Sequence, residues 1–532
     1  MIPIRPALLA ALAAAPLAAQ TPPPGFPSTR AERTAWRETS RYDDVTAFLS
    51  QLARRSPRHL RLTEMGYTTE GRAIPLAVAG RVRDAGPEAV RAAGRTVIYI
   101  QGNIHAGEVE GKEALLALLR DIAAGRHAHW LDSLVILAAP DYNADGNERV
   151  SLTNRPLQNG PVGGTGQRAN AQGLDLNRDH TRLETPEARG QTGLWRRYDP
   201  HVAIDLHTTN GSYHAYLLTY AEPLHPATDP AIQQLVREEW LPWVAWRIAA
   251  RDGWDLFFYG NTAESPVDRG GGGSEPGWYT FDHRPRFSEN YWGLRNRFGI
   301  LAEGYSYASF EDRVRVMRRF LVETLEYAWA NAGRLRAMTA AADARRLTGD
   351  SLPVRARLHR GDTITVLMGA VTEERHPYTG QRVLVRRPER RAERMLDFTT
   401  FEGAEYTRVP AAYLVPASLR AVSDRLAAHG VVTRVLTEPR EVALERFRID
   451  STWTAVREFQ GHRERTVTGA WESATDTLPV GTMVVPMDQP LARLAFILLE
   501  PRSDDGFLDW NLLDDALAGA RYYPIRRTFG AL

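Results

Sequence analysis

The 532-residue sequence contains no cysteine, so no disulfide holds the fold, and stability must come from core packing and from any bound metal. Charge of one sign is not in excess either, because 66 Lys and Arg residues stand against 64 Asp and Glu residues. The charge pattern therefore predicts neither a nucleic-acid partner nor an anionic membrane surface. Lysine is nearly absent, with Lys112 as the single example, and we attribute this bias to genome composition rather than to arginine chemistry.

Long apolar runs are also scarce, and the one that stands out lies at the N-terminus. Arg5 precedes an apolar stretch from Ala7 to Ala19, and a proline-rich segment follows. The stretch is too short to span a bilayer, and small residues near Ala19 and Gln20 suit signal-peptide cleavage. We predict a signal peptide over residues 1–20, a secreted or periplasmic protein and no transmembrane segment. The alternative is a disordered or core-packed N-terminus.

The remaining sequence has the composition of a folded protein with two or more domains, being 43% hydrophobic and 24% charged. Apolar strand patterns alternate with helical ones, which predicts an α/β fold with a mixed, largely parallel sheet covered by helices. Near residues 348–354 the pattern changes to shorter alternating runs, so we expect a first domain over 25–345 and a smaller β-rich domain over 350–532. The strand candidates are 96–101, 133–139, 201–206 and 298–302, and the helix candidates are 109–124, 184–197, 229–251 and 311–334.

Two polar loops interrupt this alternation. The loop over residues 143–173 is long for a compact domain, and loops of that length usually line a site or are mobile. The run Arg269-Gly270-Gly271-Gly272-Gly273-Ser274 has no Gly-Lys-Ser/Thr ending. It therefore predicts a flexible loop rather than a phosphate-binding one.

The segment His105-Ala106-Gly107-Glu108 follows the first of these strands and precedes a helix. The Ala-Gly turn lets the histidine and the glutamate reach one metal ion, although a single His-x-x-Glu match is expected by chance among 14 histidines. His207 ends another buried strand, and the carboxyl ends of parallel strands meet at one edge of a sheet. Two histidines and one glutamate leave a position open for water, which is the catalytic arrangement of a zinc site.

Glu303 ends a further apolar strand, Phe298-Gly299-Ile300-Leu301-Ala302. A carboxylate in such a run is costly unless it has a cationic partner or a functional role. We predict that Glu303 is the general base that takes a proton from water. An edge glutamate paired to an arginine is the alternative.

Between these elements lies the segment Gln167-Arg168-Ala169-Asn170-Ala171-Gln172-Gly173-Leu174-Asp175-Leu176-Asn177-Arg178. Taken together with this segment, the chain resembles the zinc metallocarboxypeptidases of the carboxypeptidase A type (peptidase family M14). In that family a His-x-x-Glu pair and a distant strand-end histidine bind zinc, an Asp-x-Asn-Arg segment lies between them, and a strand-end glutamate follows. The same order occurs here. The resemblance covers about residues 30–335, also takes in Glu70-Gly71-Arg72 and Asn143-Ala144-Asp145-Gly146, and implies the carboxypeptidase-like (phosphorylase/hydrolase-like) fold.

The resemblance also implies a role for each matching residue. One Zn²⁺ per chain would be bound by His105, Glu108 and His207, while Asp175 would accept a hydrogen bond from a zinc-bound histidine. Glu303 would activate water and return the proton to the departing amine. The remaining roles concern the peptide substrate, whose free C-terminal carboxylate Asn177 and Arg178 would hold. Arg168 would stabilise the oxyanion, with Arg155 as a second candidate. Tyr279 or Tyr291 would cap the bound substrate.

Two other functions stay open at this point. A zinc-dependent N-acyl amino acid amidase of the aspartoacylase or succinylglutamate desuccinylase type shares the zinc ligands and the Asn-Arg pair, and often carries a β-rich C-terminal domain. Such amidases are usually shorter and cytoplasmic, which the predicted signal peptide argues against. The second alternative is a non-catalytic peptide-binding protein on the same scaffold. The sequence does not predict the side-chain preference at the cleaved residue, because residues 253–291 have no clear register against the family. It does not predict the oligomeric state either.

Overall fold

The structure is a computed structural model that describes residues 22–209, 211–263 and 275–530. The predicted signal peptide and the predicted glycine-rich loop at 269–274 lie outside the described residues. Within the described part, none of the helices combines the length and apolar character that a membrane crossing requires.

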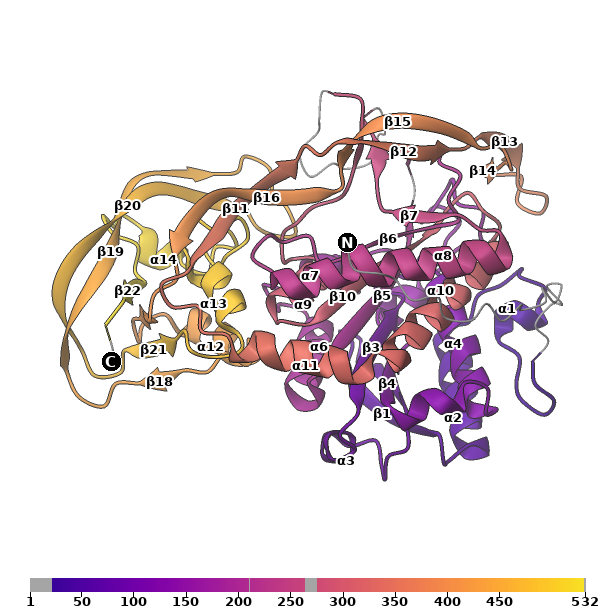
Figure 1. The fold of residues 1–532 in the computed structure, drawn as a ribbon, viewed down its shortest axis with the longest axis horizontal. Coiled ribbons are helices and arrows are strands. Elements are labelled where there is room, and N and C mark those ends of the chain that lie inside the picture. The colour runs from indigo at the N-terminus through magenta and orange to yellow at the C-terminus, as the bar shows by residue number, and fades with distance from the viewer. Residues whose placement is uncertain (1–21, 210, 264–274, 531–532) are drawn as a thin grey trace, which may run out of the picture.

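A mixed eight-stranded sheet forms the centre of the molecule (Figure 1). Its four central strands run parallel to one another, and antiparallel pairs flank them on both sides. The predicted mixed, largely parallel sheet is thereby confirmed. In spatial order the strands are β1 (Leu60–Tyr67), β2 (Ala73–Ala79), β4 (Leu134–Ala139), β3 (Thr96–Gly102), β5 (Val202–Thr209), β10 (Phe298–Tyr305), β6 (Leu218–Ala221) and β7 (Leu256–Phe258).

The central strands are continuous apolar runs because both faces of the sheet are covered. Side chains alternate across a strand, so Ile98 and Ile100 pack in one hydrophobic cluster while Val97 and Tyr99 pack in another. The first cluster includes residues of α2 (Tyr42–Arg55), α4 (Glu110–Ala123), α8 (Leu241–Asp252), α10 (Phe310–Ala330) and α11 (Ala332–Ala344). The second includes residues of α3 (Pro87–Ala92), α6 (Pro186–Tyr198), α9 (Ser288–Leu294), α12 (Arg420–His429) and α13 (Ala492–Leu499).

Two predicted helices are interrupted. The stretch expected over 229–251 forms α7 (Pro230–Gln234), a π-helical turn (Leu235–Trp240) and then α8. Pro242, at the start of α8, has no N–H to donate to the preceding turn, which favours a break there. The stretch expected over 311–334 breaks at Asn331, which separates α10 from α11.

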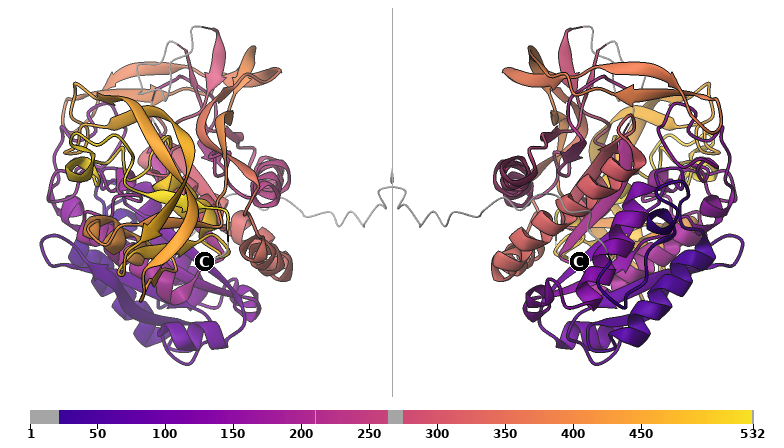
Figure 2. Two further views of the ribbon diagram at one scale, coloured as in Figure 1. Left: turned by 90° about the vertical axis from the view of Figure 1, so that its left-hand side faces the viewer. Right: turned by 90° about the vertical axis from the view of Figure 1, so that its right-hand side faces the viewer.

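The C-terminal region is rich in strands and also contributes the helices α12, α13 and α14 (Asp514–Leu517). Its largest sheet is antiparallel, and the long curved ribbon of its last two strands faces the viewer in the left view of Figure 2. In spatial order this sheet contains β18 (Arg434–Val435), β21 (Met483–Pro486), β17 (Ala412–Val415), β22 (Arg526–Thr528), β19 (Arg440–Thr454) and β20 (Arg465–Leu478).

The C-terminal region is joined to the first part by shared packing. A four-stranded sheet combines β8 (Asn261–Thr262) and β9 (Gly277–Tyr279) with β12 (Thr363–Met368) and β15 (Arg391–Phe398). The second hydrophobic cluster likewise includes residues from both parts of the chain. The domain boundary expected between residues 345 and 350 therefore stays a prediction. The remaining elements are α1 (Arg30–Arg33), α5 (Ala144–Glu148), and the pairs β11 (Ser351–His359) with β16 (Thr400–Arg408) and β13 (Val371–Arg375) with β14 (Arg382–Arg386).

Candidate active site

The chain places four candidate residues at the carboxyl ends of neighbouring parallel strands. His105 follows β3 in a tight turn, and Glu108 lies just before α4. His207 and Glu303 are partners in the register of β5 and β10, so the two side chains start from adjacent strands. Gly107 is needed in the turn, since a Cβ there would lie 2.9 Å from the Gly166 carbonyl oxygen.

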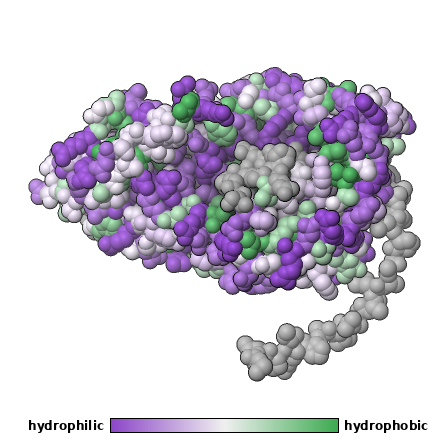
Figure 3. Space-filling view, turned by 90° about the horizontal axis from the view of Figure 1, so that it is seen from above, coloured by the Kyte–Doolittle hydropathy of each residue, from purple (hydrophilic) through white to green (hydrophobic). Residues whose placement is uncertain are grey.

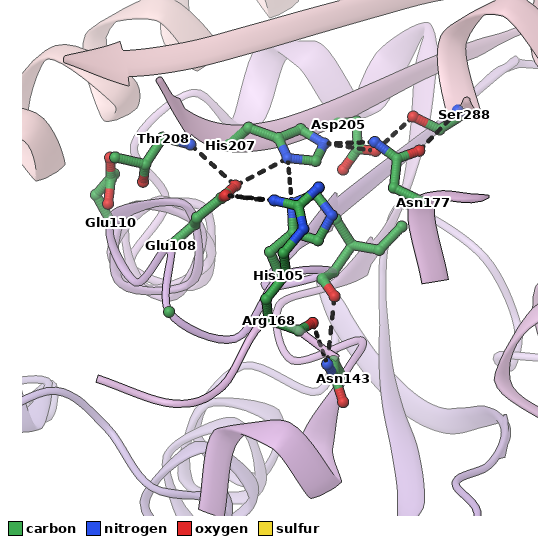
Figure 4. Close-up of polar contacts among 12 residues, drawn as sticks. His105, Glu108, Glu110, Asn143, Arg168, Asn177, Asp205, His207, Thr208 and Ser288 are labelled. Carbon is green, nitrogen blue, oxygen red and sulfur yellow. Dashed lines mark hydrogen bonds and ion pairs between the residues drawn. The ribbon is translucent and has the colours of Figure 1, made fainter. Parts of the chain in front are cut away.

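His105, Glu108 and His207 converge on one point (Figure 4). One potential ligand atom from each lies within 4.8 Å of the others, and all three residues are buried. Glu108 Oε2 lies 2.9 Å from His207 Nδ1, and Glu108 Oε1 lies 3.2 Å from His105 Nδ1. Two imidazole nitrogens and a carboxylate form a donor set that zinc binds in catalytic sites.

A carboxylate fixes the far nitrogen of each histidine. His105 Nε2 lies 2.9 Å from Asp175 Oδ1, and His207 Nε2 lies 3.0 Å from Asp205 Oδ2. Each contact selects the tautomer with the proton on Nε2, which leaves Nδ1 free to bind a metal ion. Asp175 thus contacts His105, and its role as the acceptor for a zinc-bound histidine stays a prediction, while the contact of Asp205 with His207 was not predicted.

Glu303 is the one partly exposed residue of the otherwise buried strand β10. It lines a cavity of about 640 Å³ together with His105, Glu108 and His207. Burial, together with the neighbouring charge of Glu108, raises the pKa of Glu303 to about 8, against the opposing effect of His207. A carboxyl group with such a pKa can both accept and release a proton near neutral pH.

The two arginines near the metal-ligand candidates differ in how exposed their side chains are. Arg155 donates to Glu108 Oε1 at 3.0 Å, and its other nitrogens donate to the Thr208 carbonyl oxygen and to Gln158. Arg168 contacts Asp175 at 2.8 Å and keeps 42% of its side chain exposed. Its Nη1 also lies 3.3 Å from His105 Nδ1, so both arginines are engaged, and it is the greater exposure of Arg168, 42% against 13% for Arg155, that makes Arg168 more accessible to a developing oxyanion.

Arg178 and Asn177 line the same cavity. The Arg178 guanidinium stacks on Phe287 at 3.9 Å and donates to the Asn177 carbonyl oxygen at 2.7 Å, which leaves further N–H groups for a ligand. Asn177 uses its side-chain oxygen to accept from Ser288 N at 2.9 Å, so its amide N–H₂ is the group that can face a substrate. Its amide nitrogen lies 3.5 Å from His207 Nε2.

Residues 45–206 match the family described as zinc carboxypeptidase. The chain therefore contains a zinc carboxypeptidase domain over these residues. It is 25% identical to Carboxypeptidase 2 of Trichophyton tonsurans over 452 residues, which cover 81% of this chain and 76% of that protein. Carboxypeptidase 2 of Trichophyton rubrum is 25% identical over 515 residues, covering 92% of this chain and 86% of that protein. A metallo-carboxypeptidase structure from Burkholderia cenocepacia aligns with 17% identity and a TM-score of 0.40, covering 56% of this chain and 70% of that chain.

The metal-ligand candidates of this metallocarboxypeptidase have perturbed pKa values. Burial alone would raise the pKa of Glu108, but His105 and Arg155 hold it well below its usual range. His207 is buried too, yet Asp205 and Glu108 raise its pKa well above the ordinary value. The raised pKa favours a proton on His207, so a metal ion competes with that proton for the imidazole.

The tyrosines expected to cap the substrate do not line the cavity, and this expectation is corrected. Tyr291 lies in α9 within the hydrophobic core, where its hydroxyl contacts His429 Nδ1 at 2.8 Å. Tyr279 lies in β9, where its ring stacks on Phe398 and its hydroxyl donates to the Glu275 carbonyl oxygen. Spacing along the chain failed here because the loop over residues 280–287, which does line the cavity, contains no tyrosine. Tyr279 precedes this loop in β9, and Tyr291 follows it in the buried helix α9.

Other cavity residues were missed from the sequence. Tyr259 follows β7 and lines the cavity, and burial together with the negative charge of Glu303 raises its pKa. Its position after the apolar run Leu256-Phe257-Phe258 repeats the strand-end pattern of the other site residues and could have revealed it. Asp205 lies two residues before His207 and hence on the same face of β5, a spacing that could have signalled a partner for the histidine.

Replacing Asp205 with Asn is expected to weaken metal binding by about 10- to 100-fold. The neutral amide lacks the negative charge of the carboxylate, so it holds the proton on His207 Nε2 less strongly. The Asp175→Asn variant should show a loss of similar size through His105. Competition with a chromogenic chelator measures both affinities. An unchanged affinity in Asp205→Asn would show that the carboxylate does not orient the ligand.

Proposed function

We propose that this metallocarboxypeptidase hydrolyses the C-terminal peptide bond of a peptide, with Glu303 as general base and with Asn177 and Arg178 holding the terminal carboxylate. One observation carries the proposal: the His105, Glu108 and His207 cluster, Glu303 and Arg178 line a single cavity. A metal site next to an arginine with unused donors suits cleavage beside a carboxylate.

His105, Glu108 and His207 would hold one zinc ion, which supplies Lewis-acid polarisation of the scissile carbonyl when bound. Glu303 takes a proton from the attacking water as the oxygen bonds to the carbonyl carbon. The developing oxyanion lies within reach of Arg168, whose guanidinium is held by Asp175. Glu303 then gives the proton to the departing nitrogen as the C–N bond breaks, which returns the carboxylate to its starting state.

Arg178 would bind the terminal carboxylate through two parallel N–H donors. Its stacking on Phe287 fixes the plane of the guanidinium before a substrate arrives. Burial lowers the pKa of Arg178, although Asp175 opposes this effect, so a substrate carboxylate would relieve an incompletely compensated cation. These contacts support a role in choosing free C-termini over blocked ones.

The value of kcat/KM is expected to fall as the pH is lowered, with an apparent pKa for Glu303 between 4.5 and 8. Glu303 must be ionised to act as a base, and its pKa of about 8 applies without a cation. A bound cation favours the carboxylate and so moves this pKa down toward the ordinary value of 4.5. A pH profile of kcat/KM for the metal-loaded enzyme measures the acidic limb, and a profile that stays flat down to pH 4 would contradict the assignment.

Export to a secreted or periplasmic location remains part of this proposal and rests on the composition of residues 1–20. N-terminal sequencing of the protein recovered from its native host would test it. A mature chain that begins near residue 20 is expected, and an intact N-terminus inside the cytoplasm would contradict it.

Mass spectrometry of products from an N-blocked hexapeptide tests the proposed reaction. We expect release of one residue at a time from the C-terminus. Cleavage at internal bonds, or removal of only the N-terminal acyl group, would contradict it, and the second result would favour the amidase alternative. Binding of the peptide without any product would favour the non-catalytic alternative.

A further inference from the structure

The loop between β19 and β20 forms one wall of the cavity. Ala455, Arg457, Phe459 and Glu464 line it, although about 150 residues separate them from Glu303. The C-terminal region thus reaches the candidate active site through the tip of its longest hairpin. Elsewhere, on the face seen in Figure 3, hydrophobic residues are scattered among hydrophilic ones in the described part of the surface.

Direct contacts hold this tip against the first part of the chain. Gln460 accepts a hydrogen bond from Asp175 N at 2.8 Å through its side chain, and another from Arg182 at 2.8 Å through its carbonyl oxygen. Beside it, His462 Nε2 lies 2.9 Å from Glu184 Oε1. The loop is therefore fixed before substrate binds, and its contact with Asp175 connects it to the residue that orients His105.

Glu464 and Phe459 complete the anchoring through Arg286. This buried arginine donates to Glu464 Oε1 at 2.7 Å and lies over the Phe459 ring at 5.3 Å. Arg286 also bonds Asp505 Oδ1 at 2.9 Å, so its charge is fully matched. A guanidinium engaged in this way serves the structure and is not available to a ligand.

The other arginines of the cavity have carboxylate partners as well, apart from Arg457, and Arg178 lies 3.9 Å from Asp175 Oδ2 with N–H groups left for a ligand. Arg155 is bound to Glu108, Arg168 to Asp175, and Arg284 to Asp282. Arg457 lines the cavity with an exposed side chain and has no hydrogen bond or ion pair with any residue that the structure describes. In the proposed function Arg178 binds the terminal carboxylate, so Arg457 is a second cation of the same cavity that can bind a substrate anion.

Among the residues that the structure describes, no carboxylate of the cavity forms an ion pair with Arg457, and Glu303 has its proposed task as the general base. Glu108, Asp282 and Glu464 are each paired with the arginines already described. Glu289 receives a hydrogen bond from Ser288 Oγ at 3.0 Å, and burial raises its pKa to about 7. An anion from outside the protein is the partner that the charge distribution favours.

We propose that Arg457 is a specificity-determining residue that selects peptides with an Asp or Glu side chain within their last two residues. The inference rests on the proposed carboxypeptidase function. The terminal carboxylate occupies Arg178, and the acidic side chain of the same peptide pairs with Arg457 across the cavity. The C-terminal region is then a substrate-recognition element, because its hairpin supplies the side chain that reads the substrate.

The test compares kcat/KM for N-blocked tripeptides that differ only by Glu or Gln, placed at the last position in one pair and at the penultimate position in the other. We expect the wild-type enzyme to favour Glu by about five- to tenfold in one of the two pairs, the range expected for a charge-assisted pair at a partly exposed site. Arg457→Ala should reduce this ratio to near one, Arg457→Lys should keep part of it, and raising the salt concentration should reduce it.

Arg463→Ala is the matched control, because Arg463 is an exposed arginine of the same loop that does not line the cavity. The control should keep the wild-type ratio. Equal rates for Glu and Gln in both pairs, or an unchanged ratio in Arg457→Ala, would overturn this inference while leaving the carboxypeptidase function in place. Hydrolysis of none of the peptides would overturn the proposed function and this inference with it.

Discussion

Glu303→Gln should lower kcat by about three orders of magnitude while the protein keeps its metal, since a positioned general base typically contributes 10²–10⁴-fold. The amide has the size of the carboxyl group but cannot accept the proton from water. Glu303 belongs to β10 and does not contribute to the His105, Glu108 and His207 cluster, so metal content should not change. Steady-state kinetics and metal analysis of the same preparation measure the two quantities.

The matched control for this variant is Glu464→Gln, which changes another carboxylate that lines the same cavity. Its kcat should stay close to the wild-type value, because Glu464 contacts Arg286 and none of the proposed reacting groups. A Glu303→Gln enzyme with full activity and full metal content would remove Glu303 from the mechanism.

His207→Ala is expected to abolish metal retention, and activity with it. The variant removes one of three ligand candidates and leaves the Glu108 and Asp205 carboxylates without their shared imidazole partner. The loss of affinity should exceed the roughly 10- to 100-fold expected when only a supporting carboxylate is changed. Metal analysis after dialysis against a weak chelator, followed by an activity assay with added zinc, measures both effects.

His201→Asn is the control, because His201 lies just before the opposite end of the same strand. His201 Nδ1 accepts a hydrogen bond from Val97 N at 3.1 Å, and an asparagine side chain can also accept one. This variant should retain metal and activity. A His207→Ala protein that binds zinc as tightly as the wild type would contradict the assignment of the metal site.

The fold was predictable where the chain is buried on both faces. The strands β3, β4, β5 and β10 are continuous apolar runs, and each predicted start lies within one residue of the start in the structure. Those runs also marked the site, because His105, His207 and Glu303 follow or end them. Helix breaks were less predictable, since Pro242 changes the hydrogen-bonding of one turn without changing the apolar pattern around it.

The remaining parts of the site depend on contacts that sequence spacing does not encode. Gln460 meets Asp175 across 285 positions of the chain, and no local pattern announces such a contact. Tyr279 comes closer than Tyr291 to the expected spacing from Glu303, but Tyr279 stacks on Phe398 in β9 and Tyr291 lies in the core within α9. Asp205 lies within the buried-strand pattern Val202-Ala203-Ile204-Asp205-Leu206, and this pattern by itself predicts a strand but no partner for His207.

Hydrolysis of two N-blocked dipeptides, identical except for a free or an amidated C-terminus, tests the central claim most directly. The metal-loaded wild-type enzyme should cleave the free form at least about 100-fold faster, since the loss of a charged partner leaves the partly buried Arg178 uncompensated. Arg178→Ala should lose most of this preference by slowing cleavage of the free form. Equal rates on both peptides by the wild-type enzyme would contradict the carboxylate-binding role of Asn177 and Arg178, and with it the proposed carboxypeptidase mechanism.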